Sequence, residues 1–187
     1  MPTREDALAL LQEYNAAALV THGLAVEGAM RYMARKAGED EALWGMVGLL
    51  HDVDYEKFPS EHCHKGAQIL QERGYSDEII RAMMSHGWGI CTEVEPLSRM
   101  EKTLYAIDEL TGLITACALV RPSRSVMDLE LSSAKKKYKD ARFAAGASRE
   151  VIQKGADMLG VSIDELIVDV IAAMREIAPS LGLEMKE

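Results

Sequence analysis

Four of the five histidines fall at or near the predicted ends of helices. These four are His22, His51, His62 and His86. Asp52 directly follows the second of them, and Asp108 lies at the edge of an apolar helical stripe, where an unpaired carboxylate would be costly. Imidazole and carboxylate groups together are typical ligands of a divalent transition metal. Their order along the chain therefore predicts a metal centre to which several helices contribute.

The stretch from Trp44 to Leu50 is almost wholly apolar and ends in His51-Asp52. A helix that is apolar on all sides is buried, so it would deliver this pair to the interior of the protein. Burying the carboxylate requires a compensating charge, which a metal ion supplies. The alternative is a helix end at which both side chains reach solvent, and the other histidines favour the metal site.

Composition indicates an ordinary globular protein and excludes several classes of function. The chain has 187 residues, 48% of them hydrophobic, and a formal net charge of −9, which argues against a binder of nucleic-acid polymers. The three cysteines form no CxxC motif and are expected to be reduced thiols. No signal-peptide pattern opens the chain, and the apolar stretch near residues 110–120 is too short to span a bilayer. We therefore expect a cytoplasmic protein without a membrane partner.

Helical periodicity runs through nearly every segment, and no alternating strand pattern is present, so the predicted fold class is all-α. The expected helices cover about 3–20, 21–36, 40–50, 60–73, 76–86, 98–119, 148–160 and 162–177, with 125–142 unassigned. This places His22 at the first turn of the second helix and His62 in the first turn of the fourth. The last helix carries an apolar stripe from Ile163 to Ile177, which we interpret as core; a homodimer formed through it is the alternative.

The order of these residues resembles the HD-domain superfamily, whose members are metal-dependent phosphohydrolases and a few oxygenases. His22 matches the first family histidine, His51-Asp52 the HD pair, and Asp108 the closing aspartate. His62 precedes a Gly-Ala pair by four residues, as in the family, and His86 matches a later histidine. The resemblance covers about residues 20–120. We expect one HD domain over 1–187, with the helices of 121–187 completing it.

The resemblance and the ligand chemistry together imply how metal would be held. One divalent transition-metal ion (Mn, Fe, Zn or Ni) would be bound by His22, His51, Asp52 and Asp108. Asp52 would bridge to a second ion held by His62 and His86; the alternative is that these two histidines contact substrate phosphate. A metal-bound hydroxide would then attack a small phosphate ester or nucleotide.

Other polar residues near the HD pair are candidates for catalysis. Asp54 and Glu56 are candidates for a general acid or a water-positioning base, with an exposed loop acid as the alternative. The candidate phosphate contacts are Lys57, Lys65 and Arg121. The predicted catalytic set is Asp52, Asp54 and Lys65.

Three further features have plainer interpretations. The basic cluster of Lys135, Lys136, Lys137, Lys139 and Arg142 is interpreted as a solvated face, with a phosphate cover as the alternative. His64 is expected at the surface, and Cys63 is expected to be a small buried side chain.

The function predicted from the sequence is thus that of a metal-dependent phosphohydrolase. Two rivals use the same residues: a di-iron oxygenase, and a non-catalytic sensor that binds a nucleotide or metal. The ligand set alone does not separate these chemistries.

Overall fold

The computed structural model describes residues 2–185, and the predicted all-α fold is confirmed. Within this range the chain forms ten α-helices, one short 3₁₀ helix (η1) and no strand. The elements are α1 (Arg4–Tyr14), α2 (Ala17–Ala37), α3 (Glu41–Leu50), η1 (Pro59–Glu61), α4 (His64–Glu72), α5 (Asp77–Ser85), α6 (Arg99–Leu119), α7 (Leu131–Lys139), α8 (Arg149–Leu159), α9 (Ile163–Glu176) and α10 (Ala178–Leu181).

Capping residues set several of these boundaries. The Ser98 hydroxyl accepts a hydrogen bond from the Glu101 backbone N–H, and the Glu101 carboxylate accepts one from the Ser98 N–H, so α6 begins with a capping box. Ser162 forms the same motif at the start of α9. Gly160 ends α8 in the left-handed conformation, with φ of 70°. The boundaries predicted from these three residues are confirmed.

The predicted break between the first two helices is wrong. It lies at Asn15-Ala16 rather than near residue 20, because the Asn15 side chain donates hydrogen bonds to the carbonyls of Leu11 and Val53. The second of these bonds is a tertiary contact, which the sequence pattern does not reveal. His22 therefore lies inside the long helix α2 and not at its first turn.

Two other segments differ from prediction. The expected helix over 60–73 is divided into η1 and α4, because Cys63 adopts a positive φ of 66° between them. His62 therefore lies in the connection, before α4 begins. The unassigned segment 125–142 contains α7. Pro179 lies within α10, which begins at Ala178, and the chain after it buries Leu183 instead of tailing off.

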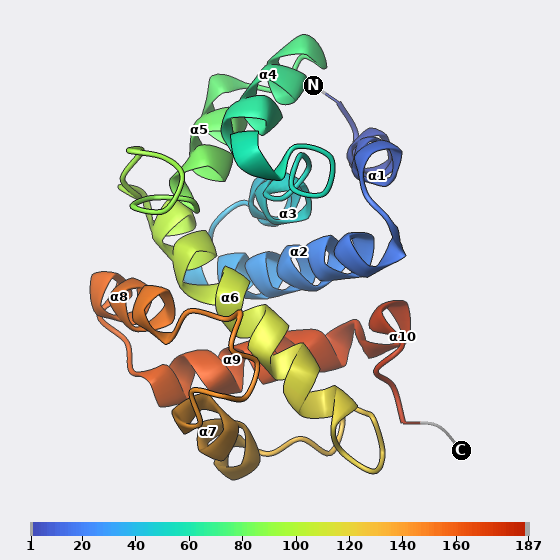
Figure 1. Cartoon of the computed structure of the whole chain (residues 1–187), viewed down its shortest axis with the longest axis vertical. Coiled ribbons are helices and arrows are strands. Elements are labelled where there is room, and N and C mark those ends of the chain that lie inside the picture. The colour runs from blue at the N-terminus through green and yellow to red at the C-terminus, as the bar shows by residue number, and fades with distance from the viewer. Residues whose placement is uncertain (1, 186–187) are drawn as a thin grey trace.

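Helix α2 crosses the middle of the molecule, with α1 and α3 on one side of it and α6 and α9 on the other (Figure 1). One hydrophobic cluster runs through both halves of the chain and includes Leu50, Ile107 and Ile167. Helix α8 approaches α6 very closely at Gly155, where a Cβ atom would lie 2.4 Å from Ala106 Cα. The second half of the chain is thus packed directly against α6, which carries Asp108, and α9 packs against α2, which carries His22.

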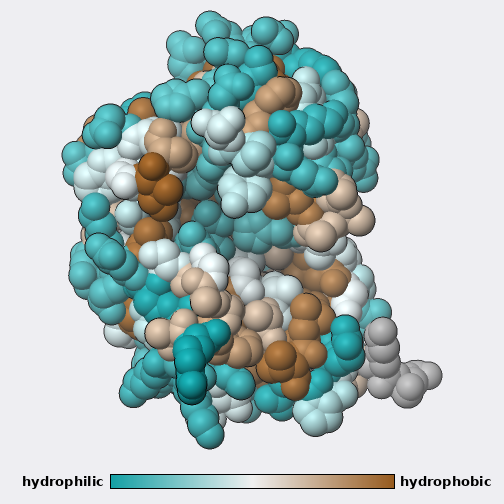
Figure 2. All heavy atoms as spheres, viewed as in Figure 1, coloured by the Kyte–Doolittle hydropathy of each residue, from teal (hydrophilic) through white to brown (hydrophobic). Residues whose placement is uncertain are grey.

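The surface is mainly polar on the face drawn in Figure 2, where hydrophobic residues form small patches between hydrophilic ones. Large exposed hydrophobic side chains include Ile90, Leu97 and Val120. None of the helices within residues 2–185 combines the length and the apolar character that crossing a membrane requires.

Candidate metal centre

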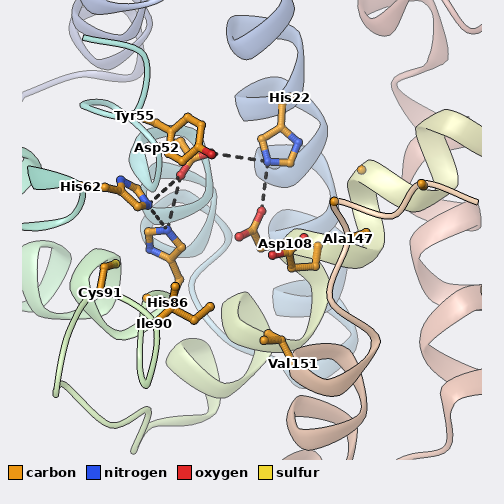
Figure 3. Close-up of a pocket in the computed structure, with 15 residues that line it drawn as sticks. His22, Asp52, Tyr55, His62, His86, Ile90, Cys91, Asp108, Ala147 and Val151 are labelled. Atoms are coloured by element: carbon orange, nitrogen blue, oxygen red, sulfur yellow. Dashed lines mark hydrogen bonds and ion pairs between the residues drawn. The ribbon is translucent and has the colours of Figure 1, made fainter. Parts of the chain in front are cut away.

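Side chains from five separate segments converge at one place (Figure 3). Helix α2 contributes His22, α6 contributes Asp108, and His51-Asp52 follow the last residue of α3. His62 comes from the connection before α4, and His86 caps the C-terminus of α5. We call this group the metal centre; it comprises His22, His51, Asp52, His62, His86 and Asp108. The structure brings together all six metal ligands proposed from the sequence.

Asp52 lies between two pairs of imidazoles. Its Oδ2 atom is 3.4 Å from Nε2 of His51 and 3.8 Å from Nε2 of His22. Its Oδ1 atom is 3.4 Å from Nε2 of both His62 and His86. One carboxylate therefore presents each of its oxygens to a different histidine pair, which is the arrangement expected of a ligand that bridges two ions.

Asp108 completes the first of these two sides. Its Oδ1 atom lies 3.0 Å from Nε2 of His22 and 3.2 Å from Nε2 of His51. The three residues place one ligand atom each within 4.8 Å of one another, close enough to bind a common ion. Two imidazole nitrogens and carboxylate oxygens form a mixed N/O set suited to a divalent transition metal.

On the second side, Nε2 of His62 and Nε2 of His86 lie only 3.2 Å apart. Cys63 is close to the same pair, but its Sγ atom is 4.0 Å from Nδ1 of His86, the nitrogen on the other side of the ring. The thiol is fully buried, as predicted, and its pKa is raised by burial. The two Nε2 atoms and the Asp52 oxygen are therefore the ligand atoms that face one another here.

Three of the imidazoles are oriented by a partner at Nδ1. His51 and His86 donate from Nδ1 to the carbonyls of Gly48 and Met83, each three residues earlier in the chain. His62 Nδ1 lies 2.8 Å from Oδ1 of Asp54. A proton held at Nδ1 leaves Nε2 free to bind a metal, and such outer contacts fix the ring as well.

Asp54 is fully buried, although the sequence offered an exposed loop acid as its alternative. One of its oxygens binds His62, and the other accepts a hydrogen bond of 2.6 Å from the Gly66 backbone N–H. A side chain at position 66 would bring a Cβ atom to 3.1 Å from this oxygen, so glycine suits this close approach. Asp54 therefore lies behind His62, and it orients this ligand.

Without a bound ion, the two carboxylates of the metal centre are balanced by protonated imidazoles. His51 Nε2 is buried and has no hydrogen-bond partner among the described residues. Burial opposes protonation of His51, but the carboxylates of Asp52 and Asp108 outweigh it and raise the pKa of the imidazole. Burial likewise disfavours ionised Asp52 and Asp108, yet the neighbouring imidazoles hold their pKa values well below the usual range. Two ionised carboxylates around an unpaired buried nitrogen fit a bound cation.

A cavity of about 450 Å³ opens beside the metal centre. Gly87, Ile90 and Cys91 line it from the segment after α5, while Glu109 and Gly112 line it from α6. Burial, followed by the nearby Asp108 charge, raises the pKa of Glu109. Within residues 2–185, no lysine or arginine lines this cavity. Any positive charge that meets a substrate there has to come from another source.

The remaining sequence candidates lie away from the cavity. Lys65 binds Gln68 Oε1 and lies over the Phe58 ring, and Lys57 donates to the Glu13 carbonyl. Glu56 accepts a hydrogen bond from the Ala16 N–H, and Arg121 forms an ion pair with Asp128. His64 is exposed and lies near the Cys91 carbonyl. In the basic cluster, Lys135 pairs with Asp164 and the Arg142 side chain is 94% exposed.

Sequence reasoning missed two parts of the cavity. Glu109 directly follows the proposed ligand Asp108 on α6, and this position could have marked it as a cavity residue. The other part comprises Ala144, Gly146, Ala147 and Val151, which approach from the second half of the chain. Small and apolar side chains carry no chemical signature, so no pattern pointed to them.

The comparisons with known proteins agree with this geometry. A family model described as HD domain matches residues 19–113, a range that contains all six residues of the metal centre. No solved structure matches the chain. The match covers half of the sequence and confirms the resemblance that the histidines and aspartates indicated. The chain therefore belongs to the HD-domain family, a superfamily of metal-dependent hydrolases.

Proposed function

We propose that this protein is a metal-dependent phosphohydrolase that acts on a small phosphate ester or nucleotide. The observation that carries the proposal is the position of Asp52, whose two oxygens face two separate histidine pairs at distances of 3.4–3.8 Å. Family membership supports the same chemistry.

The residues divide into two ligand sets. His22, His51 and Asp108, with Oδ2 of Asp52, would hold one divalent ion. His62 and His86, with Oδ1 of Asp52, would hold the second. Bound ions of Mn, Fe, Zn or Ni would supply an activated water nucleophile and positive charge against the phosphoryl oxygens.

The cavity lining supports the use of both ions. A phosphate monoester brings about two negative charges at neutral pH. Because no lysine or arginine within the described residues lines the cavity, the ions would have to balance this charge. The ionised carboxylates of Asp52 and Asp108 add negative charge to the lining. This balance favours two ions over one, and a monophosphate over a polyphosphate.

The protein itself would orient the ligands and shape the site. Asp54 holds His62 with Nε2 directed at Asp52, and the carbonyls of Gly48 and Met83 do the same for His51 and His86. A site whose ligands are fixed before the reaction does not have to reorganise as charge develops.

The test is elemental analysis of the purified protein, followed by a hydrolysis screen that measures released phosphate for monoesters and nucleotides and the released alcohol for diesters. Oxygen uptake is recorded in the same reactions. We expect metal-dependent phosphate release that is abolished in Asp52→Asn and retained in Glu56→Gln, a matched change of a neighbouring acid outside the cavity. Release that survives complete removal of metal, or oxygen uptake without release, would contradict the proposal.

A further inference from the structure

One wall of the cavity comes from residues 140–148, the connection between α7 and α8, which we call the loop wall. Ala144, Gly146 and Ala147 line the cavity from this segment, and Val151 continues the lining on α8. In Figure 3 it is the brown ribbon that carries Ala147 and Val151. The loop wall lies outside the segment that the family model matches. The ligands and this wall therefore come from different parts of the chain.

Arg149, the first residue of α8, ties this segment together. Its Nη1 atom donates to the carbonyls of Ala144 and Ala147, both at 2.7 Å. Its Nε atom donates to the Tyr138 carbonyl at 3.1 Å. Its Nη2 atom binds the carbonyls of Lys137, Asp140 and Phe143. A single guanidinium thus contacts six carbonyls between residues 137 and 147.

The setting of Arg149 is unusual for a cation. The first turn of a helix carries the positive end of the helix dipole, which disfavours a positively charged side chain. The guanidinium also has no carboxylate partner within residues 2–185. Carbonyl oxygens of the preceding loop therefore replace the usual partner. Because Gly155 packs α8 tightly against α6, the guanidinium is attached to a fixed support.

Besides Arg149, the loop wall is held by packing of Phe143, Ala144 and Ala147 against the core and by two backbone turn hydrogen bonds. The segment contains no regular secondary structure, and Ala144 has a positive φ of 46° that alanine rarely adopts. Loops of this kind open locally at low cost unless their backbone groups are bound. Arg149 makes four hydrogen bonds to the backbone of the loop wall, so the shape of the cavity on this side depends strongly on this side chain.

We propose that Arg149 is a positioning residue that fixes the loop wall and so sets which substrates fit the cavity. This inference rests on the proposed phosphohydrolase function for its kinetic test. Arg149 does not line the cavity, so its effect on a substrate passes through Ala144, Gly146 and Ala147.

The kinetic test compares Arg149→Lys with the wild type on p-nitrophenyl phosphate. Lysine keeps the charge but lacks the planar set of donors, so most of the six bonds are lost. We expect KM to rise roughly tenfold while kcat changes less than about threefold, because the metal ligands stay in place. The matched control is Arg175→Lys, since Arg175 also donates to loop carbonyls, those of Val126 and Leu129, and none of these residues lines the cavity. An unchanged KM in Arg149→Lys would overturn the proposal.

Limited trypsin digestion provides a readout that does not depend on activity. Trypsin cuts after lysine and arginine, and Lys139 and exposed Arg142 lie at the start of the loop wall. We expect cleavage there to be about tenfold faster in Arg149→Lys than in the wild type or Arg175→Lys. Equal cleavage rates would overturn the inference. If the wild type hydrolyses no phosphate ester but trypsin cleaves the variant faster, the result would count against the proposed function. It would still support the role of Arg149 in fixing the loop wall.

A second variant covers the case in which Arg149→Lys does not fold. Ala147→Leu enlarges a side chain that lines the cavity and leaves every Arg149 contact to a backbone carbonyl available. We expect it to raise KM more for 4-methylumbelliferyl phosphate, which is bulkier, than for p-nitrophenyl phosphate. Equal changes for the two esters would contradict a role of the loop wall in substrate fit.

Discussion

The two sides of the cavity are built in different ways. On the side of the metal centre, three of the histidines each have a separate partner: the Gly48 carbonyl for His51, Asp54 for His62 and the Met83 carbonyl for His86. On the opposite side, one guanidinium, that of Arg149, contacts six carbonyls, four of them in the loop wall and two at the end of α7. The histidine positions therefore depend on three separate contacts, whereas a single side chain makes four of the hydrogen bonds that hold the loop wall.

This difference predicts which property a substitution would alter on each side of the cavity. A substitution that removes one of these outer partners should weaken metal binding at one ligand and leave the other ligands in position. A substitution of Arg149 should leave metal binding intact and alter which substrates fit. The predictions below test this division, beginning with the largest expected effect.

Asp54→Asn tests the support of a single ligand. An amide can still accept at one atom, but it lacks the charge that favours a proton on Nδ1 of His62. Loss of such an outer contact typically lowers metal affinity or activity by about 10–100-fold. The measurement is kcat/KM together with metal content. Activity equal to that of the wild type would show that Asp54 does not orient His62.

Gly155→Ala tests the close packing of α8 against α6, which supports the loop wall. The added Cβ atom would lie 2.4 Å from Ala106 Cα, so α8 has to move away from α6. We expect a loss of about 1–3 kcal/mol in the free energy of unfolding, as for other overpacked cores. Denaturant unfolding measures it, with exposed Gly146→Ala as the control, because no atom lies within 4 Å of a Cβ there. Unchanged stability would contradict the close packing of α8.

The metal-free protein should lose stability as the pH rises. The pKa values of His51 and His86 are raised because Asp52 and Asp108 outweigh burial. Protonated imidazoles therefore stabilise the folded state fully below the ordinary histidine pKa of 6.5, and this contribution is lost as the pH rises through the raised values.

Thermal unfolding between about pH 5 and pH 9 measures this effect. A metal-loaded sample should lack the decline, because its ligand nitrogens are already deprotonated. His64→Gln is the control, since His64 is exposed and outside the metal centre. A metal-free protein whose Tm rises steadily over this range would contradict the charge balance described here.

Lys65→Ala should have the smallest effect. The sequence marked Lys65 as catalytic, but its ammonium group lies at Gln68 and over Phe58, outside the cavity lining. Truncating a charge that does not touch the substrate should change kcat/KM by less than about threefold. A larger loss, with unchanged metal content, would mean that Lys65 reaches the substrate during turnover.

The sequence allowed the ligand side to be predicted because its chemistry is carried by rare residue types. His22, His51-Asp52 and Asp108 stand out against helical patterns, and capping residues such as Ser98 mark where helices begin. The role of Asp54 was not predictable, because it depends on burial and on the Gly66 N–H twelve residues later.

The loop wall was not predictable for a physical reason. Its contacts use backbone carbonyls, which every residue has, and its lining consists of alanine and glycine. The errors at Asn15 and Cys63 have the same origin. The hydrogen bond from the Asn15 side chain to the distant Val53 carbonyl ends α1. The positive φ of Cys63, a non-glycine residue, makes α4 begin later than predicted.

The most direct test of the central claim is calorimetric titration of the chelator-treated protein with Mn²⁺, in the wild type and in Asp52→Asn. If Asp52 bridges two histidine pairs, the wild type should bind two ions per chain and the variant should lose affinity for both. A wild type that binds no metal, or an Asp52→Asn variant that binds the same number of ions with the same affinity, would contradict the account.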